Sequence, residues 1–285
     1  MPGLVEIVEM GPRDGLQNEQ RLIPAADKIA LIDRLTACGF RKIEVTSFVS
    51  PKWVPQMADA AEVMAGISRA SGVTYAVLTP NLHGYKAARD AGADEVAIFG
   101  SASEGFSQHN INCSVAESFR RFEPVMAAAK ADGIPVRGYI SCVTDCPYDG
   151  PTQPAKVIDA AVRLSDMGCY QISLGDTIGR ATPETTRTLL DALLTRLPPG
   201  RFAGHFHDTA GKALKNIEIS LEYGIRVFDS AVGGLGGCPY APGAKGNVDT
   251  LAVAARLNEL GFETGLSFAP LLDAASFAKS LRGAA

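Results

Sequence analysis

The sequence predicts an α/β protein: a (β/α)8 barrel, the TIM-barrel architecture, with a short C-terminal helical extension. Short β-branched runs alternate with Ala- and Leu-rich stretches of helical periodicity, eight times along 285 residues. A glycine follows several of the helical stretches, where the backbone must leave the helix before the next strand: Gly39, Gly92, Gly133, Gly168 and Gly224. Eight successive β-then-α units favour a closed parallel barrel, and an open doubly wound sheet is the alternative.

The expected elements follow this alternation in order. The strands are runs rich in Val, Ile and aromatic residues: Val5–Glu9, Lys42–Thr46, Thr74–Leu78, Glu95–Phe99, Val136–Ile140, Gln171–Leu174, Phe202–His207 and Arg226–Ser230. The helices are the amphipathic stretches between and after them: Ala25–Cys38, Gln56–Ile67, Leu82–Ala91, Ser114–Ala131, Gln153–Met167, Pro183–Arg196, Lys212–Tyr223, Val248–Leu260 and Phe268–Ser280. No Pro/Gly/Ser-rich linker divides the chain, so residues 1–285 are expected to form one domain.

The composition excludes several classes of protein. With 46% hydrophobic and 20% charged residues, the chain suits a globular enzyme with a substantial core. A net charge of −4 with scattered Lys and Arg argues against a nucleic-acid partner. No apolar run reaches the length of a membrane span and no leader precedes Val5, so we expect a cytoplasmic protein. The six cysteines are expected to be reduced thiols, without a structural zinc site.

Polar residues gather where the expected strands end. Arg13 and Asp14 follow the first strand, Ser47 ends the second, Asp176 follows the sixth, and His207 ends the seventh. A glycine-rich loop, residues 233–238, follows the eighth. Because all strands of such a barrel point the same way, these residues converge on one face, where barrel enzymes carry their active sites.

Two histidines in one expected strand form the sharpest signal. His205 and His207 are two apart, so their imidazoles point to the same face. The alternative is a pair of hydrogen-bonded interior histidines. With an anionic oxygen from Asp14 and an amide oxygen from Asn247, the set suits Mg²⁺ or Mn²⁺ better than zinc. Asn247 could instead cap the helix that follows it.

Three further side chains have candidate chemical roles. Arg13 could hold a developing enolate by charge-assisted hydrogen bonds, or form an ion pair with Glu44. Glu44, inside an apolar strand, needs a buried partner in either case. Cys238 lies in the glycine-rich loop, where a thiol could transfer a proton or act as a nucleophile; the alternative is a small buried hydrophobe.

Five segments resemble the 3-hydroxy-3-methylglutaryl-CoA (HMG-CoA) lyase family, in order along nearly the whole chain. They are Gly11–Glu19, Ser47–Pro51, Ser173–Thr177, His205–Thr209 and Gly233–Pro239. That family belongs to a wider group of metal-dependent TIM barrels with isopropylmalate and homocitrate synthases and pyruvate carboxyltransferase domains. Many relatives carry a lysine just after the first segment, where this chain has Gln20 and then Arg21.

The resemblance implies a metal-dependent retro-Claisen cleavage of HMG-CoA to acetyl-CoA and the ketone body acetoacetate, as in leucine degradation. It implies metal ligands at Asp14, His205, His207 and Asn247. It also implies catalytic roles: enolate binding by Arg13 supported by Glu44, proton transfer by Cys238, and acid/base chemistry by Asp176. Further pocket residues implied are Gln17, Ser47, Asn110 and Tyr139. The partners implied are an acyl-CoA substrate and a second copy in a homodimer. Lys52 and Arg21 are candidates for contacting the CoA phosphates.

Three other functions stay open on the sequence. One is a Claisen-type synthase of the same group, although those enzymes carry a longer C-terminal extension. Another is a lyase for a longer 3-hydroxy-3-alkylglutaryl-CoA, because only the volume of the pocket would exclude it. The third is a non-catalytic metal- or acyl-CoA-binding barrel.

Overall fold

Eight parallel strands close into a barrel in the computed structural model, which describes residues 3–238 and 241–282, with side chains described outside residues 237–245. Around the barrel the order is β1 (Glu6–Glu9), β10 (Val227–Ser230), β9 (Phe202–Phe206), β8 (Gln171–Asp176), β5 (Val136–Ser141), β4 (Glu95–Ser101), β3 (Thr74–Leu78) and β2 (Lys42–Ser47). β1 pairs with both β10 and β2, which closes the ring. The predicted (β/α)8 barrel is confirmed, and the open-sheet alternative is wrong.

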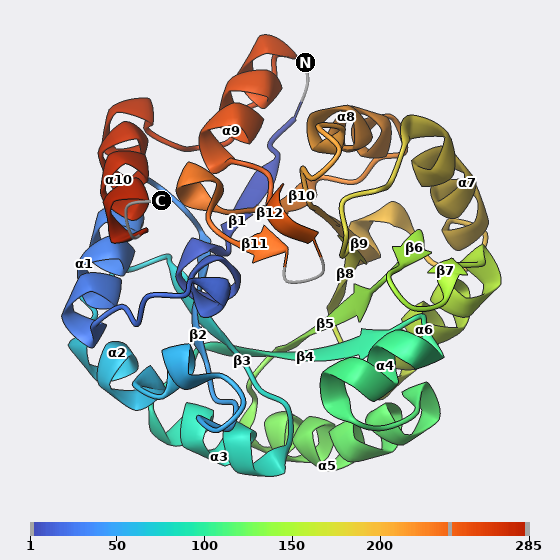
Figure 1. The fold of residues 1–285 in the computed structure, drawn as a ribbon, viewed down its shortest axis with the longest axis horizontal. Coiled ribbons are helices and arrows are strands. Elements are labelled where there is room, and N and C mark those ends of the chain that lie inside the picture. Colours follow the sequence, from blue (N-terminus) through green and yellow to red (C-terminus); the bar gives the residue numbers. More distant parts are fainter. Residues whose placement is uncertain (1–2, 239–240, 283–285) are drawn as a thin grey trace.

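The helices form a ring around the strands, seen end-on in Figure 1. They are α1 (Ala25–Thr36), α2 (Ala60–Gly66), α3 (Leu82–Asp90), α4 (Glu104–Ile111), α5 (Val115–Asp132), α6 (Pro154–Met167), α7 (Pro183–Leu193), α8 (Ala213–Glu222), α9 (Thr250–Glu259) and α10 (Phe268–Leu281). Two short hairpins, β6 (Asp145–Cys146) with β7 (Gly150–Pro151) and β11 (Gly237–Cys238) with β12 (Ala241–Lys245), lie outside the barrel sheet. None of the helices in residues 3–238 and 241–282 has the length and hydropathy that a membrane span requires.

Local capping sets the ends of several helices. Ser114 accepts a hydrogen bond from the Glu117 amide (3.1 Å) at the start of α5, which ends at Gly133 with a φ of 71°. Asp249 caps α9 by accepting from the Leu251 amide (2.7 Å). The cap of this helix is therefore Asp249, and the capping alternative for Asn247 is wrong.

Three elements differ from the prediction. The expected strand Phe202–His207 ends at Phe206, and His207 forms an isolated bridge with Asn247. The helix α4 has no counterpart among the expected helices, because its polar sequence with Gly105 has no apolar stripe; Ser103 starts it by accepting from the Phe106 amide (3.1 Å). The helix predicted from Gln56 begins at Ala60, after a 3-10 turn over Pro55–Met57. All three differences lie at the carboxyl ends of strands or in the segments that follow them, where tertiary contacts decide the local structure.

The C-terminal extension packs on the outer helices of the barrel. α10 lies against α1, where the Arg34 guanidinium stacks 4.1 Å from the Phe277 ring and pairs with Asp273 at 3.2 Å. The inner face of α10, including Leu271, Ala274 and Ala278, is buried. The predicted helical extension is therefore confirmed as part of the folded barrel.

Candidate metal centre and active-site cavity

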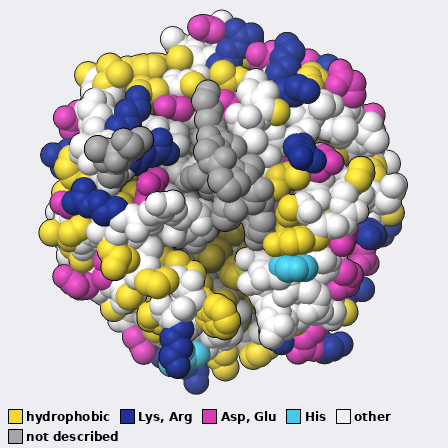
Figure 2. Space-filling model, viewed as in Figure 1, with side chains coloured by type: hydrophobic (Ala, Val, Ile, Leu, Met, Phe, Trp, Pro, Cys, Tyr) yellow, Lys and Arg dark blue, Asp and Glu magenta, His cyan; other side chains and the backbone are white. Residues whose placement is uncertain are grey.

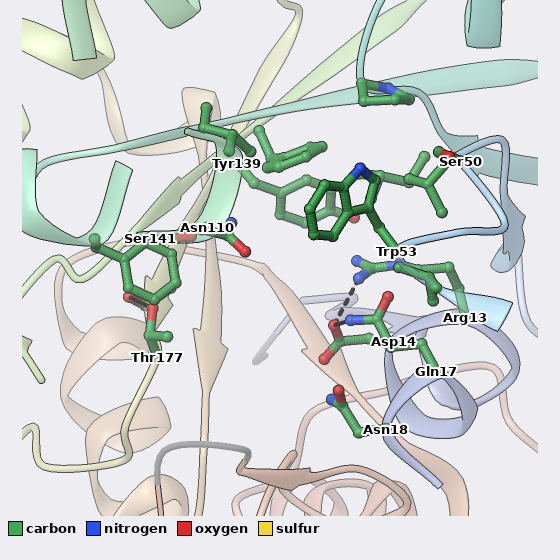
Figure 3. Close-up of a pocket in the computed structure, with 18 of the residues that line it drawn as sticks. Arg13, Asp14, Gln17, Asn18, Ser50, Trp53, Asn110, Tyr139, Ser141 and Thr177 are labelled. Atoms are coloured by element: carbon green, nitrogen blue, oxygen red, sulfur yellow. Dashed lines mark hydrogen bonds and ion pairs between the residues drawn. The ribbon is translucent and has the colours of Figure 1, made fainter. Parts of the chain in front are cut away.

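A cavity of about 930 Å³ opens at the carboxyl ends of the strands. Figure 2 shows it as a hollow near the centre of this face, with hydrophobic side chains on its floor. In Figure 3, Arg13, Gln17 and Trp53 lie on one wall, and Asn110, Ser141 and Thr177 on the opposite one. Polar residues that line it include Arg13, Asp14, Gln17, Asn110, Tyr139, Thr177, His205 and His207. The predicted convergence at this end of the barrel is confirmed.

Asp14, His205 and His207 form a compact group in this cavity. Within the described residues they are the cluster of His, Cys, Asp and Glu side chains that could hold a metal ion, with ligand atoms within 4.8 Å of one another. The Asp14 Oδ2 lies 3.8 Å from His205 Nε2 and 4.0 Å from His207 Nε2, and the two Nε2 atoms are 3.4 Å apart. This spacing leaves room for one ion between the three atoms.

The protonation states of Asp14 and His207 fit a cation. Burial alone would raise the pKa of Asp14, but the charges of Arg13 and the two histidines lower it to about 2. Burial, together with the neighbouring His205, lowers the pKa of His207 to about 4. At neutral pH Asp14 is therefore a carboxylate and His207 a neutral imidazole, as metal ligands must be.

Asn247 completes the surroundings of Asp14. Its backbone bridges to that of His207, and its amide nitrogen donates to Asp14 Oδ2 at 2.7 Å. Asn247 is 3% exposed. The structure therefore brings all four predicted ligands together, and a rotation of the Asn247 amide would direct its oxygen to the same point.

A buried carboxylate that the sequence analysis missed holds His205. Asp229 Oδ2 accepts from His205 Nδ1 (3.1 Å) and from the Ser173 hydroxyl (2.7 Å), while Arg137 donates to both carboxylate oxygens (2.8 and 3.2 Å). Burial opposes ionisation, but Arg137 and His205 lower the pKa of Asp229. This contact directs Nδ1 of His205 toward Asp229 and Nε2 toward Asp14, and although burial opposes it, the two carboxylates raise the pKa of His205. The sequence offered one signal for this role, an acidic residue inside the expected strand Arg226–Ser230.

Arg13 is locked in place by two carboxylates. Its Nη1 donates to Asp14 Oδ1 at 2.6 Å, its Nε forms a short hydrogen bond with Glu44, and Glu44 also accepts from the Tyr139 hydroxyl. Burial alone would lower the pKa of Arg13, but Glu44 and Asp14 raise it above its ordinary value. The predicted Arg13–Glu44 ion pair is confirmed, and it leaves a fixed cation on the cavity wall.

A second buried carboxylate holds the segment that carries Arg13 and Asp14. Glu9 Oε1 accepts from the amides of Gly11 (2.7 Å) and Val232 (2.8 Å), and its Oε2 accepts from the Thr250 hydroxyl (2.7 Å). A Cβ on Gly11 would lie 2.7 Å from Glu9 Oε1, so a larger residue there would displace this carboxylate. Glu9 thus ties the end of β1 to the start of the glycine-rich loop, a role that the sequence analysis did not assign.

The remaining predicted residues differ in whether they reach the cavity. Gln17 and Asn110 line the cavity, and Gln17 donates to Asp14 at 3.3 Å. Ser47 is fully buried with an unpaired hydroxyl, and it does not line the cavity. The side chain of Cys238 lies outside the described residues, although its backbone belongs to β11. Cys142 is buried.

Asp176 does not line the cavity either. Its two carboxylate oxygens accept from the amides of Arg180 and Ala181, both at 3.1 Å, and it is 1% exposed. Burial raises its pKa to about 6. Strand residues alternate between faces, so Asp176 lies opposite to Ser173, whose hydroxyl points into the barrel toward Asp229. Its neighbour Thr177 lines the cavity in its place.

Known proteins resemble the chain over nearly its whole length. A family model described as HMGL-like matches residues 4–278. The 3-hydroxy-3-isohexenylglutaryl-CoA/hydroxy-methylglutaryl-CoA lyase of Pseudomonas aeruginosa is 57% identical, covering 96% of this chain and 91% of its own. The crystal structure of the HMG-CoA lyase from Brucella melitensis is 61% identical with a TM-score of 0.97, covering 98% and 99% of the two chains.

One similar structure carries ligands. The HMG-CoA lyase from Acenitobacter baumannii, in complex with coenzyme A and 3-methylmalate, is 35% identical with a TM-score of 0.93, covering 98% of this chain and 92% of its own. With the barrel, the Asp14–His205–His207 group and the family model in agreement, this chain belongs to the HMGL-like family.

Proposed function

We propose that the chain is a divalent-metal-dependent carbon–carbon lyase that cleaves (S)-3-hydroxy-3-methylglutaryl-CoA to acetyl-CoA and acetoacetate. The observation that carries the proposal is the Asp14–His205–His207 group beside a fixed Arg13 in the 930 Å³ cavity. Its support is the 57% and 61% identity to proteins named as lyases of this substrate class. A metal-binding barrel without catalysis would not need Arg13 locked at the cavity wall.

Asp14, His205, His207 and Asn247 would hold Mg²⁺ or Mn²⁺. When bound, the metal would act as a Lewis acid that orients the substrate and acidifies its C3 hydroxyl. Asp14 and His207 present unprotonated donor atoms at neutral pH, and Asp229 fixes the Nε2 of His205 toward them. The absence of a thiolate from this donor set favours the harder Mg²⁺ or Mn²⁺ over zinc.

Arg13 would stabilise the negative charge that the reaction creates. When the C3 hydroxyl gives its proton to a general base, the C2–C3 bond breaks and acetoacetate leaves. The electron pair of that bond stays on C2 as the enolate of acetyl-CoA, whose oxygen needs a fixed cation beside it. Glu44 and Asp14 hold the Arg13 side chain before the substrate arrives, so no reorganisation is needed. Tyr139 orients Glu44, and Gln17 and Asn110 would contact the substrate from opposite walls. Cys238 would then supply the proton to the enolate carbon.

Asp176 has two competing roles. A pKa of about 6 suits the acid/base function that the resemblance implies. Its two backbone hydrogen bonds suit a positioning role, because they hold the segment after Thr177, which lines the cavity. Since its carboxylate does not reach the cavity lining, we favour positioning, and the Asp176→Asn variant discussed below separates the two.

A longer branch at C3 is a second candidate for the substrate. Several apolar side chains line the cavity, and together they offer more apolar surface than a single methyl group would cover. They are Leu78, Phe99, Phe106, Phe122 and Ile140. The name of the Pseudomonas aeruginosa relative includes an isohexenyl substrate. The test is the ratio of kcat/KM for the isohexenyl and methyl substrates, and a ratio below about 0.01 would exclude the longer branch as a physiological substrate.

The first experiment measures acetyl-CoA and acetoacetate from HMG-CoA after EDTA treatment, and again after Mg²⁺ or Mn²⁺ is restored. We expect both products in equal amounts only with metal. Acetyl-CoA with 2-oxoisovalerate serves as the control for a synthase, and thiol release from that pair without HMG-CoA cleavage would overturn the proposal. Binding of Mn²⁺ to the EDTA-treated protein, followed by electron paramagnetic resonance, tests the metal site independently of activity.

Three further properties belong to the same proposal. We propose that residues 1–285 act as one catalytic domain, which limited proteolysis would test by the absence of a stable shorter fragment. We propose a homodimer, for which light scattering would give the mass. A cytoplasmic location stays a prediction that cell fractionation would check.

A further inference from the structure

Two backbone segments enclose Asp14 at the carboxyl ends of the strands. The first, residues 11–18, carries Asp14 in the turns that follow β1, and we call it the ligand segment. The second, residues 232–236, begins the glycine-rich loop after β10, and we call it the glycine segment. The two are packed closely, because a Cβ on Gly15 would lie only 2.6 Å from the Cβ of Leu235. The position of one segment therefore limits the position of the other.

The glycine segment reaches the predicted metal ligands themselves. A Cβ on Gly236 would lie 2.9 Å from Asn247 Nδ2 and 3.5 Å from the backbone carbonyl oxygen of Asp14. The Asn247 amide in turn donates to Asp14 Oδ2 at 2.7 Å. Because protein interiors are close-packed, a shift of the glycine segment would move Asn247 relative to Asp14. The geometry of the ligand group therefore depends on where this segment is held.

Arg282, the residue that follows α10, bridges the two segments. Its Nη2 forms a short hydrogen bond with the carbonyl oxygen of Gly234, and its Nε donates to Glu19 Oε1 at 3.3 Å. Glu19 directly follows the ligand segment, and its backbone carbonyl accepts from the buried Gln56 side chain at 3.2 Å. A guanidinium suits this place, because its planar fork can donate to two acceptors at once.

The glycine segment also lies directly on α10. A Cβ on Gly233 would lie 3.3 Å from the Ala275 carbonyl oxygen and 3.5 Å from the Cβ of Ala278. Both alanines belong to the buried face of α10, which packs on α1 (Figure 1). The helix therefore supports the glycine segment, and Arg282 at its end ties that segment to Glu19.

We propose that Arg282 is a positioning residue for the metal centre, which holds the ligand segment and the glycine segment in the arrangement that sets Asp14 beside Asn247. The inference rests on the proposed metal site and not on the identity of the substrate. Arg282 does not line the cavity, so any effect on the ligands must pass through the two segments. Its side chain is 38% exposed, and an ion pair this exposed adds little to stability by itself. Metal affinity and stability should therefore respond differently to its loss.

Removal of the guanidinium is the direct test. Arg282→Gln is expected to weaken Mn²⁺ binding to the EDTA-treated full chain by about 3-fold to about 10-fold, measured by electron paramagnetic resonance. Its free energy of unfolding without metal, measured in urea, should stay close to that of the wild type. Arg187→Gln, in an exposed ion pair with Glu222 at 2.8 Å, is the matched control and should leave both quantities unchanged. Wild-type Mn²⁺ affinity in folded Arg282→Gln would overturn the proposal, and so would an equal loss of affinity in Arg187→Gln.

A double-variant comparison tests the bridge itself. Glu19→Gln keeps one acceptor oxygen and removes the charge, so it should weaken Mn²⁺ binding less than Arg282→Gln does. If one guanidinium joins the two segments, the Arg282→Gln/Glu19→Gln double variant should bind Mn²⁺ no more weakly than Arg282→Gln alone. Additive losses would refute the bridge. No HMG-CoA cleavage by the wild type, together with weakened Mn²⁺ binding in Arg282→Gln, would reject the proposed function and keep Arg282 as a positioning residue.

Discussion

Asp229→Asn tests the buried carboxylate behind His205. The substitution keeps the size of the side chain and removes its charge. The remaining oxygen can stay at the Oδ2 position and accept from Ser173, His205 and one Arg137 nitrogen. The new NH₂ group then faces the other Arg137 nitrogen, which lies 2.8 Å from Oδ1 in the wild type. A buried guanidinium is left without its counter-charge, which costs about 3–5 kcal/mol of the free energy of unfolding.

The same substitution weakens metal binding, because the imidazole of His205 loses the charge that increases its basicity. Loss of such a carboxylate typically lowers metal affinity about 10- to 100-fold. Urea unfolding of metal-free protein measures the first effect, and Mn²⁺ titration of the folded variant measures the second. Asp273→Asn, in an exposed ion pair with Arg34, is the control and should change neither. Wild-type Mn²⁺ affinity in folded Asp229→Asn would refute the role of Asp229 in orienting His205.

Three other predictions concern Arg13, Glu9 and Asp176. Arg13→Gln should lower kcat by about a hundredfold or more at saturating metal, since a fixed donor to the enolate is lost; a wild-type kcat would remove Arg13 from the chemistry. Burial raises the folded-state pKa of Glu9 to about 7, so the stability of the wild type should fall as pH rises from about 4.5 to about 7. Glu9→Gln should remove that part of the pH dependence, on the order of 3 kcal/mol, and parallel pH curves for variant and wild type in urea unfolding would contradict it. Asp176→Asn should lower kcat/KM without changing the shape of its pH profile, whereas loss of an ionisation near pH 6 would establish acid/base chemistry.

Side chains alternate between the two faces of a strand, and this alternation explains much of what could be predicted for the site. His205 and His207 share a face because they are two apart in the extended chain that runs past the end of β9, and the barrel brings Asp14 to the same end. The same alternation, applied to β8, places Asp176 on the opposite face from Ser173, and its carboxylate bonds the backbone of Arg180 and Ala181. The resemblance supplied Asp176 as an acid/base candidate without testing which face it occupies.

The sequence by itself determined the barrel, its order of strands and the convergence of Arg13, Asp14, His205 and His207, because these depend on local periodicity and on the common direction of parallel strands. Only the tertiary structure decided which buried polar groups meet. Asp229 contacts Arg137, 92 residues earlier, and Glu9 contacts Thr250, 241 residues later. No local pattern encodes such pairs: each buried charge demands a partner, but which strand supplies it depends on the closure and register of the barrel.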